Sequence, residues 1–237
     1  MAKASWCNVS PMSGKRDGIL TISAGAHTGR VARNTVVTVT AANGTKPSAS
    51  IAVSQAGAGV STTMDTSKPD LPSSGGVVNI NGTSNSSKLK WTCTARVVGV
   101  DMPIDDNYVK VAVNGGNIGN NVAIPGDPGA SGRFNFVATL TFPASMFPVD
   151  AVVTFRLTDD TDSAKQCTFT WKAGASSLSV NKSSLSLVNG GTGQTVNVTS
   201  NDDWNVLLIG YKEERIGNVL NRNLSLLLMI LPIRHWR

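Results

Sequence analysis

The chain has 237 residues, of which 41% are hydrophobic and 15% are charged, and its formal net charge is +6. This length predicts about two small domains, and the low charge reflects an abundance of Gly, Ser, Thr, Asn and Val, residues that favour short strands and frequent turns. The positive charge permits an anionic partner, but Lys and Arg are not clustered with aromatic residues, so nucleic acid is not an expected partner.

The N-terminal segment, residues 1–57, contains three short runs in which apolar and polar residues alternate. These runs are residues 19–24, 35–41 and 49–54. Alternation with period two predicts half-buried strands, and NGTKP at 43–47 predicts a turn between the last two. AGAGVS at 56–61 is typical of a flexible linker.

The central segment, residues 58–175, has at least six strand-like runs separated by turn sequences. The runs are residues 77–80, 89–98, 107–113, 133–142, 150–158 and 166–172. Strands at this spacing, with almost no helical pattern, predict a two-sheet sandwich of the immunoglobulin type. Trp91 and Trp171 lie in two of these runs, and we expect them to fill the space between the sheets.

Three cysteines, Cys7, Cys93 and Cys167, are widely spaced and odd in number. This pattern argues against a disulfide framework and against a zinc site. Cys93 and Cys167 both lie in strand-like runs and could face each other, but buried free thiols are the favoured interpretation.

A third unit begins near residue 176 and echoes the start of the second. SSLSVNKSSLSLVNGGTGQTVNVTSNDDW, from residue 176, resembles STTMDTSKPDLPSSGGVVNINGTSN, from residue 61. In both, Gly-Gly is followed by Val-Asn-Ile or Val-Asn-Val and then by Ser-Asn, which indicates tandem copies of one kind of sandwich, with the unit broken off near residue 206.

The last segment, residues 207–237, differs in composition from the rest of the chain. It contains the chain's only glutamates, Glu213 and Glu214, and the leucine-rich run LSLLLMILPI at 224–233. That run is shorter than the ~20 residues of a membrane span, and no other run reaches this length. Two interpretations stay open: a C-terminal helix that docks on a partner, or a shifted reading frame that yields an atypical or disordered tail.

Several motifs resemble the BACON domain family. They are Trp6, Ser10-Pro11-Met12-Ser13-Gly14, Val37-Thr38-Val39-Thr40-Ala41-Ala42-Asn43 and Ser54-Gln55-Ala56-Gly57. The resemblance covers residues 5–57, and residues 178–206 are similar to the opening of the same pattern. It implies small immunoglobulin-like modules, as in Bacteroidota surface and carbohydrate-active proteins and in virion proteins of crAss-like bacteriophages, with glycan as the family's proposed ligand.

The chain thus resembles the rear of one BACON-like domain, a whole sandwich, and the front of another. Two explanations are open for the incomplete first domain. It is a minimal sandwich, or residues 178–204 of one copy complete residues 5–57 of a neighbour by strand addition, which would cover an open sheet edge.

No set of residues predicts catalysis, a cofactor or a bound metal, so we expect a protein that is not an enzyme. His27 and His235 have no nucleophile pattern around them, and GGNIGN at 115–120 reads as a hairpin loop rather than a phosphate cradle. Two acidic clusters, at residues 101–106 and 159–162, are expected to be solvated turns. The alternative for the second is a calcium site built from DDTD, although its spacing lacks the full loop pattern of an EF-hand.

The candidate glycan contacts are Trp6, Lys15, Arg16, Arg30 and Arg33, as one aromatic residue beside a basic rim. Because MAKASWCNVS has no apolar signal core, we expect synthesis without export. The predicted function is a structural virion protein, an auxiliary capsid or head-fibre decoration. Its expected partners are the major capsid protein, copies of itself and host surface glycans. The alternative is a carbohydrate-binding accessory module on a bacterial cell surface.

Overall fold

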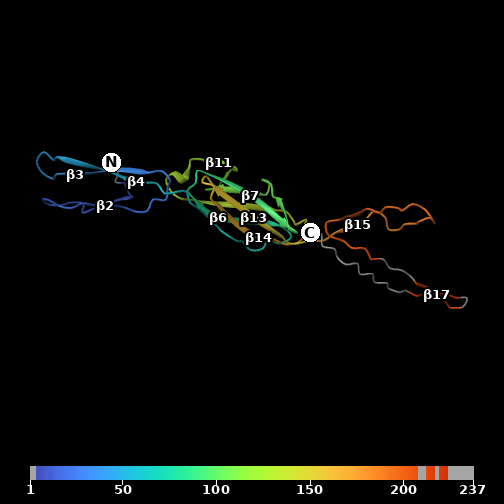
Figure 1. Cartoon of the computed structure of the whole chain (residues 1–237). Helices are drawn as coiled ribbons and strands as arrows, with labels where there is room; N and C mark the ends of the chain where they lie inside the picture. Colours follow the sequence, from blue (N-terminus) through green and yellow to red (C-terminus); the bar gives the residue numbers. More distant parts are fainter. Residues whose placement is uncertain (1–3, 208–211, 217–218, 224–237) are drawn as a thin grey trace. The chain divides into compact units, whose positions relative to one another are not determined.

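The computed structural model describes residues 4–207, 212–216 and 219–223. The chain forms two compact units, Met1–Ala175 and Ser176–Arg237, which are described separately. The fold is all-β, as the sequence predicted: apart from one 3-10 turn at Pro128–Ala130, the regular elements of the described residues are strands (Figure 1). The finer division into segments 1–57, 58–175, 176–206 and 207–237 stays a prediction.

The centre of the first unit is a sandwich of two sheets. The first sheet has the strand order β10 (Gly116–Ile118), β9 (Val109–Val113), β12 (Phe134–Phe142), β6 (Gly76–Ser84) and β5 (Thr62–Met64). The second has the order β11 (Val122–Ala123), β7 (Lys88–Val97), β13 (Ala151–Asp159) and β14 (Ala164–Trp171), with β8 (Val100–Pro103) also on β7.

The core lies between these sheets because alternate residues of each strand point inward. The most deeply buried side chains of the central strands are Phe136, Ala138 and Leu140 on β12 and Val153, Phe155 and Leu157 on β13. Trp91 and Trp171 are each 6% exposed, so the prediction that they fill the core is confirmed. The Trp171 ring lies 5.0 Å from that of Phe142, between centroids.

The cysteines of the sandwich are buried and free, as the favoured interpretation expected. Cys93 and Cys167 both sit opposite Phe155 but on its two different neighbour strands, β7 and β14. Two strand spacings of ~4.8 Å separate them, which is beyond disulfide reach. The possibility that they face each other is therefore wrong.

The sandwich has two distinct ends. Thr62, Ser84 and Phe134 are paired neighbours at one end. At the other end, Leu71 bridges Trp171 in parallel orientation. Ser67 bridges Thr168 in the same way, so the segment after β5 crosses to the second sheet and lies along the outer edge of β14.

Residues 4–57 form two hairpins that extend from the sandwich (Figure 1). One pairs β1 (Cys7–Ser10) with β2 (Thr21–Ala24), and the other pairs β3 (Arg33–Thr40) with β4 (Ser48–Gln55). The predicted NGTKP turn connects β3 and β4, where Gly44 and Lys46 adopt positive φ.

The sequence analysis missed several short strands, and two of them, β8 and β10, follow left-handed turns. β8 follows a tight turn in which Val98 and Gly99 have φ of 47° and 82°. β10 lies inside GGNIGN, which was predicted to be loop only; the turn is confined to Asn114 and Gly115, and the chain then returns along β9. In both hairpins two consecutive left-handed residues match the twist of the flanking strands.

The second unit contains two described hairpins, β15 (Leu178–Val180) with β16 (Val198–Ser200), and β17 (Lys212–Ile216) with β18 (Val219–Asn223). The run LSLLLMILPI, for which a docking helix or a frameshifted peptide was considered, lies outside the described residues. No described helix is long and apolar enough to cross a membrane.

Candidate functional site

Arg30 joins the N-terminal hairpins to the sandwich. Its Nε donates to the carbonyl of Asn85 at 2.5 Å, and its Nη2 forms a hydrogen-bonded ion pair with Asp127. The Arg30 backbone N–H also donates to Gly129, at 3.0 Å. The predicted rim residue Arg30 is thus 21% exposed at its side chain and held by the 124–130 loop, so it has a structural role at the junction.

Asn85 is the buried centre of this junction, with 1% of its surface exposed. Its Oδ1 accepts from the Ser61 N–H at 2.8 Å, and its Nδ2 donates to the carbonyls of Thr28 and Gly59 at 2.8 and 3.1 Å. One amide therefore holds together the connection between the two hairpins, the linker and the start of the sandwich. The AGAGVS sequence, expected to be a flexible linker, is tied down at this point.

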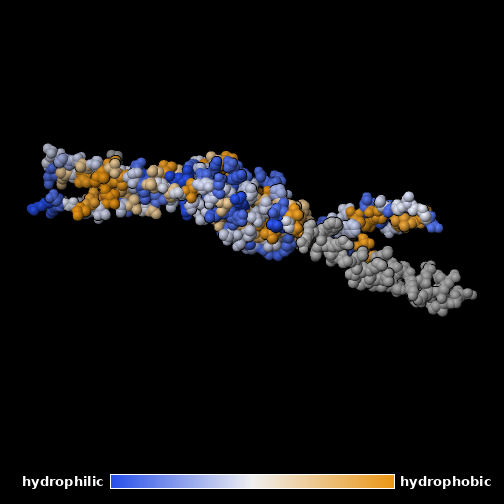
Figure 2. Space-filling view, in the orientation of Figure 1, coloured by the Kyte–Doolittle hydropathy of each residue, from blue (hydrophilic) through white to orange (hydrophobic). Residues whose placement is uncertain are grey.

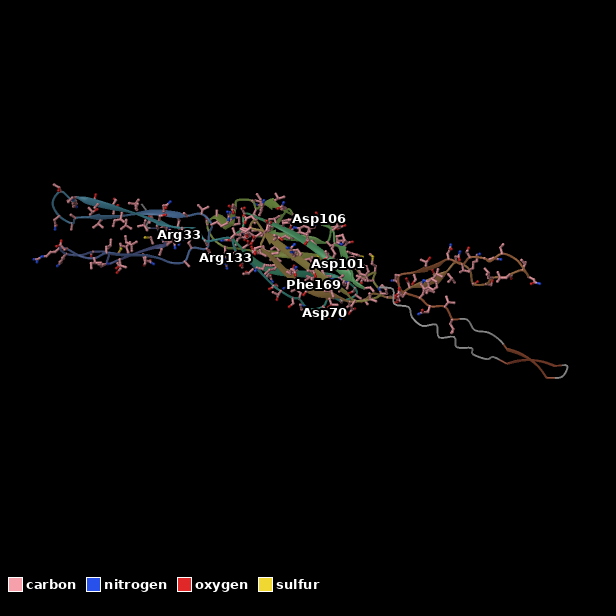
Figure 3. The ribbon with its side chains drawn as sticks, in the orientation of Figure 1. Arg33, Asp70, Asp101, Asp106, Arg133 and Phe169 are labelled. Atoms are coloured by element: carbon pink, nitrogen blue, oxygen red, sulfur yellow. The ribbon has the colours of Figure 1, made fainter. Side chains whose placement is uncertain are left out.

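Arg33 and Trp6 connect the two hairpins. The Arg33 guanidinium lies 4.7 Å from the centroid of the half-buried Trp6 ring, a cation–π contact. Its Nε also donates to Gln55 Oε1 at 2.9 Å, and Gln55 Nε2 donates to the Gly25 carbonyl at 2.8 Å. Figure 3 shows Arg33 on the hairpins and Arg133 at the edge of the sandwich, beside the junction.

Lys15 and Arg16 are exposed in the loop between β1 and β2, where Arg16 has a φ of 58°. The predicted contact set therefore divides by environment: these two side chains face solvent, whereas Arg30, Arg33 and Trp6 have intramolecular partners. As a glycan-contact set it stays a prediction.

The N-terminal hairpins expose aliphatic side chains along their strands. Val36, Val39 and Ile51 are 61%, 52% and 43% exposed. Figure 2 shows a hydrophobic patch over β3, β4 and the neighbouring hairpin. In the described structure β3 and β4 form a sheet of two strands, so the outer edge of β4 carries unpaired backbone groups.

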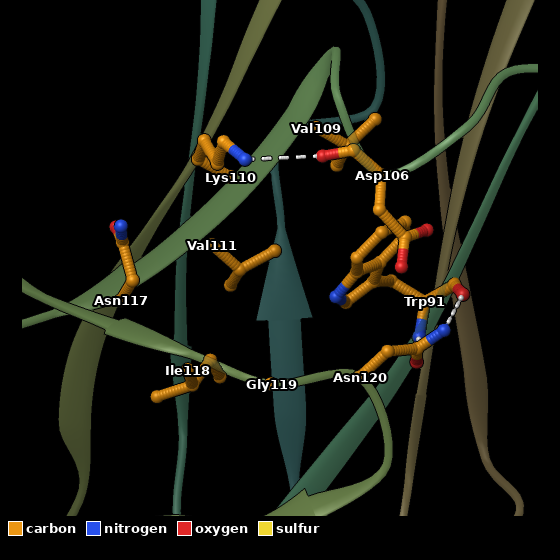
Figure 4. Close-up of a pocket in the computed structure, with 9 residues that line it drawn as sticks. All are labelled: Trp91, Asp106, Val109, Lys110, Val111, Asn117, Ile118, Gly119 and Asn120. Carbon is orange, nitrogen blue, oxygen red and sulfur yellow. Dashed lines mark hydrogen bonds between the residues drawn. The ribbon is translucent and has the colours of Figure 1, made fainter.

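A small hollow of about 290 Å³ opens on the sandwich between β7, β9 and β10 (Figure 4). Its wall includes Trp91, whose indole N–H has no hydrogen-bond partner among the described residues, and the exposed carboxylate of Asp106. Asn120 fixes the Trp91 backbone, accepting from its N–H at 2.9 Å and donating to its carbonyl at 3.1 Å. The indole nitrogen itself is buried, so the exposed Asp106 carboxylate is the group of this wall that a small hydroxyl-rich ligand can reach.

The acidic clusters differ from each other. Asp105 accepts from the Asn107 N–H at 2.8 Å, the local bond expected of a turn. Asp159 is buried, with 4% exposure, and accepts from Thr62, Thr161 and Ser163. The expectation that its cluster is a solvated turn is therefore wrong for this residue. Among the described residues, no three His, Cys, Asp or Glu side chains converge as metal ligands.

Two titrating groups near these features are perturbed. Burial acts to raise the pKa of Asp160, but hydrogen bonds from Ser87 and Ser86 and the nearby Arg30 charge together hold that pKa below its usual value. Burial raises the pKa of the Cys93 thiol to about 12, so this cysteine is not a thiolate near neutral pH.

Sequence reasoning missed Asn85, Asp127 and the hollow beside Trp91. Asn85 belongs to the repeated Ser-Asn motif, which was a visible signal of a shared structural role. Asp127 carried no signal, because its partner Arg30 is 97 residues away in the chain.

Comparison with known proteins supports a binding module at the N-terminus. Residues 1–56 match the family model BACON, described as "Putative binding domain, N-terminal". The protein is thus all-β, and its first quarter is similar to the BACON domain family. A search of the curated proteins found no match.

Among solved structures, a variant of BcpA, the major pilin subunit of Bacillus cereus, is similar at 13% identity with a TM-score of 0.25. The match covers 78% of this chain and 66% of the pilin, just under two thirds of its length. At this TM-score the similarity says nothing about what the chain binds or assembles with.

Proposed function

We propose that this protein is a non-enzymatic structural component of a bacteriophage virion, in which a β-sandwich carries an N-terminal binding segment. The binding part is supported by the BACON match over residues 1–56. The virion setting rests on the resemblance of the same segment to virion proteins of crAss-like phages. The partners we propose are the major capsid protein and host surface glycans.

The observation that carries this proposal is the ordered junction around Asn85 and Arg30. Bonds from both residues attach the binding segment to a sandwich with a continuous core. A segment fixed in this way is presented at a set distance and orientation, which is what a spacer on a particle surface requires. Many weak contacts presented side by side then add up to firm attachment.

The test is to purify phage particles from the community that carries the gene and to identify their proteins by mass spectrometry. We expect this chain to co-purify with capsid protein through a density gradient, in a constant ratio. Recovery in bacterial envelope fractions, with none in the particles, would refute the virion assignment.

A second candidate function is a carbohydrate-binding accessory module of a bacterial surface protein, and the hollow beside Trp91 favours it. We expect Asp106→Ala, which removes the exposed carboxylate of the hollow, to abolish binding on a glycan array. Asp101→Ala is the matched control, because Asp101 is an exposed acid paired with Arg96 outside the hollow. Equal loss in both variants would exclude the hollow as the glycan site.

A further inference from the structure

The hairpin β15–β16 shares its strand register and two side-chain-to-backbone hydrogen bonds with the hairpin β5–β6. Ser61 N–H donates to Asn85 Oδ1 at 2.8 Å, and Ser177 N–H donates to Asn201 Oδ1 at 2.7 Å. The strand registers also correspond: Thr62 lies opposite Ser84, as Leu178 lies opposite Ser200.

A second pair of bonds confirms the equivalence. The N–H of Asn81 donates to Asp65 Oδ2 at 2.9 Å, and the N–H of Asn197 donates to Asn181 Oδ1 at 2.8 Å. Each residue of one hairpin therefore has its counterpart at a constant spacing along the chain. The repeat, approximate in sequence, is close in structure, so residues 177–201 are built as the opening segment of a sandwich.

The two copies of this opening segment differ in burial. Leu71 and Ile80 are 4% and 0% exposed, because they pack in the hydrophobic core of the sandwich. Their counterparts Leu187 and Val196 are 65% and 40% exposed. The opening segment in the second unit has its own hydrogen bonds but lacks a described surface on which to bury its aliphatic side chains.

The N-terminal hairpins have the matching features of a closing segment. β4 corresponds to β14, since each is eight residues long, ends one hairpin and is followed within two residues by Ala-Gly. The bond that follows each strand is also shared: Ala58 N–H donates to the Gly29 carbonyl at 2.8 Å, and Gly174 N–H donates to the Phe147 carbonyl at 2.7 Å.

One face of the β3–β4 hairpin, with the exposed Val39 and Ile51 and the half-buried Val37, lies where the sandwich has core residues, whereas the exposed Val36 lies on the other face. Val37 and Val39 on β3 occupy the alternate positions that are buried as Phe155 and Leu157 on β13. Ile51 on β4 corresponds to the buried Cys167 on β14. The closing segment, the N-terminal hairpins, thus has an exposed apolar face and an unpaired β4 edge. The opening segment in the second unit has exposed aliphatic residues that could cover such a face.

The chain's own opening segment cannot reach its own closing segment. The N-terminal segment joins the sandwich near Phe134, whereas Gly174 leaves near Phe147, at the far end of β12. β12 has nine residues, or about 30 Å at ~3.3 Å per residue. The two residues after Gly174 span at most ~7 Å, and the docked segment would start farther away still, at the hairpin tips.

We propose that residues 177–206 of one copy dock on the N-terminal hairpins of a second copy and complete a sandwich there. Residues 183–187 then lie parallel to Ala52–Gln55 of β4, as Ser67 and Leu71 lie along β14. The charges are compatible, because residues 1–57 carry six Lys or Arg and one Asp, whereas residues 176–206 carry one Lys and two Asp. Since the two surfaces differ, copies join head to tail in an open-ended series. This proposal is independent of the virion setting.

The first test traps the register with cysteines in the full chain. Ala52→Cys and Ser183→Cys together place thiols at the counterparts of the paired residues Thr168 and Ser67. Oxidation is expected to give a ladder of disulfide-linked multimers on a non-reducing gel. Ala52→Cys with Ser186→Cys, three residues out of register, is expected to give none, and an equal ladder from both pairs would overturn the register.

The second test separates this docking from general stickiness. We expect Leu187→Asp to block the docking surface of residues 177–206, and Val39→Asp to block the surface of the N-terminal hairpins that receives it. Each variant should then give single chains by analytical ultracentrifugation. An equimolar mixture of the two variants is expected to give dimers and nothing longer, because each retains one working surface. Val77→Asp, which alters an equally exposed valine of the sandwich, keeps the full series.

Two results would overturn the proposal. One is an unaltered chain that sediments as a single copy at its highest soluble concentration. The other is a mixture of the two variants that stays as single chains while circular dichroism shows both to be folded.

Discussion

Replacing Asn85 by Ala tests whether one amide organises the junction between the N-terminal hairpins and the sandwich. The side chain is buried and makes three hydrogen bonds to backbone groups of Ser61, Thr28 and Gly59. Alanine removes all three bonds and leaves one N–H and two carbonyls to find other partners.

The expected loss follows from these bonds. Each contributes about 1 kcal/mol net to stability, and a buried group left without a partner costs about 1–3 kcal/mol. Allowing that water reaches part of the junction, we expect Asn85→Ala to lower the free energy of unfolding by about 3 kcal/mol. Because two of the bonds go to residues outside the sandwich, the hairpins should also detach more readily.

Asn201→Ala is the matched control, since Asn201 accepts the same bond from Ser177 in an exposed position. There water replaces the lost bond, and the expected cost is below about 1 kcal/mol. The assay is urea unfolding followed by tryptophan fluorescence, with proteolysis at residues 57–61 as a second readout. Equal costs for the two variants, or an unchanged cleavage rate in Asn85→Ala, would refute the role of this amide.

Three further predictions concern the sandwich. Gly129→Ala should loosen the junction, because the new Cβ would come within 2.2 Å of the Asn85 carbonyl oxygen; it should raise proteolysis at residues 57–61, whereas Gly14→Ala, which meets nothing within 4 Å, should not. The lowered pKa of Asp160 stabilises the fold above the unfolded value of about 3.8, and this contribution is lost as the pH falls through the folded pKa. Acid unfolding followed by fluorescence should therefore be less steep in Asp160→Asn, and an unchanged acid limb would contradict this. Cys93, buried and with its pKa raised to about 12, should react with Ellman's reagent at pH ~8 only after unfolding, and fast labelling of the native chain would contradict its burial.

The strands of the sandwich core were predictable because their pattern is local. β12 and β13 alternate apolar and polar residues over nine positions each. This alternation can be recognised in the sequence without knowing the conformation of the turns on either side. β8 and β10 were not predictable in the same way, since they have four and three residues and follow left-handed turns that end a run of alternation.

The candidate sites depended on contacts between distant parts of the chain. Arg30 was noticed as a basic residue, but its partner Asp127 comes from a loop far along the chain, so a rim residue turned out to be a junction residue. Trp91 was placed in the core correctly, yet the open space beside its indole depends on where β10 returns along β9.

The parallel pairing of the 67–71 segment with β14 has a mechanical consequence. The 67–71 segment follows the point where the chain enters the sandwich, and β14 precedes the point where the chain leaves it. Tension between the hairpins and residue 174 therefore pulls these two parallel segments in opposite directions along their length. Such a load is shared by the bridging hydrogen bonds at once instead of opening them one by one. The sandwich is therefore built to carry a pulling force from one side to the other without unravelling.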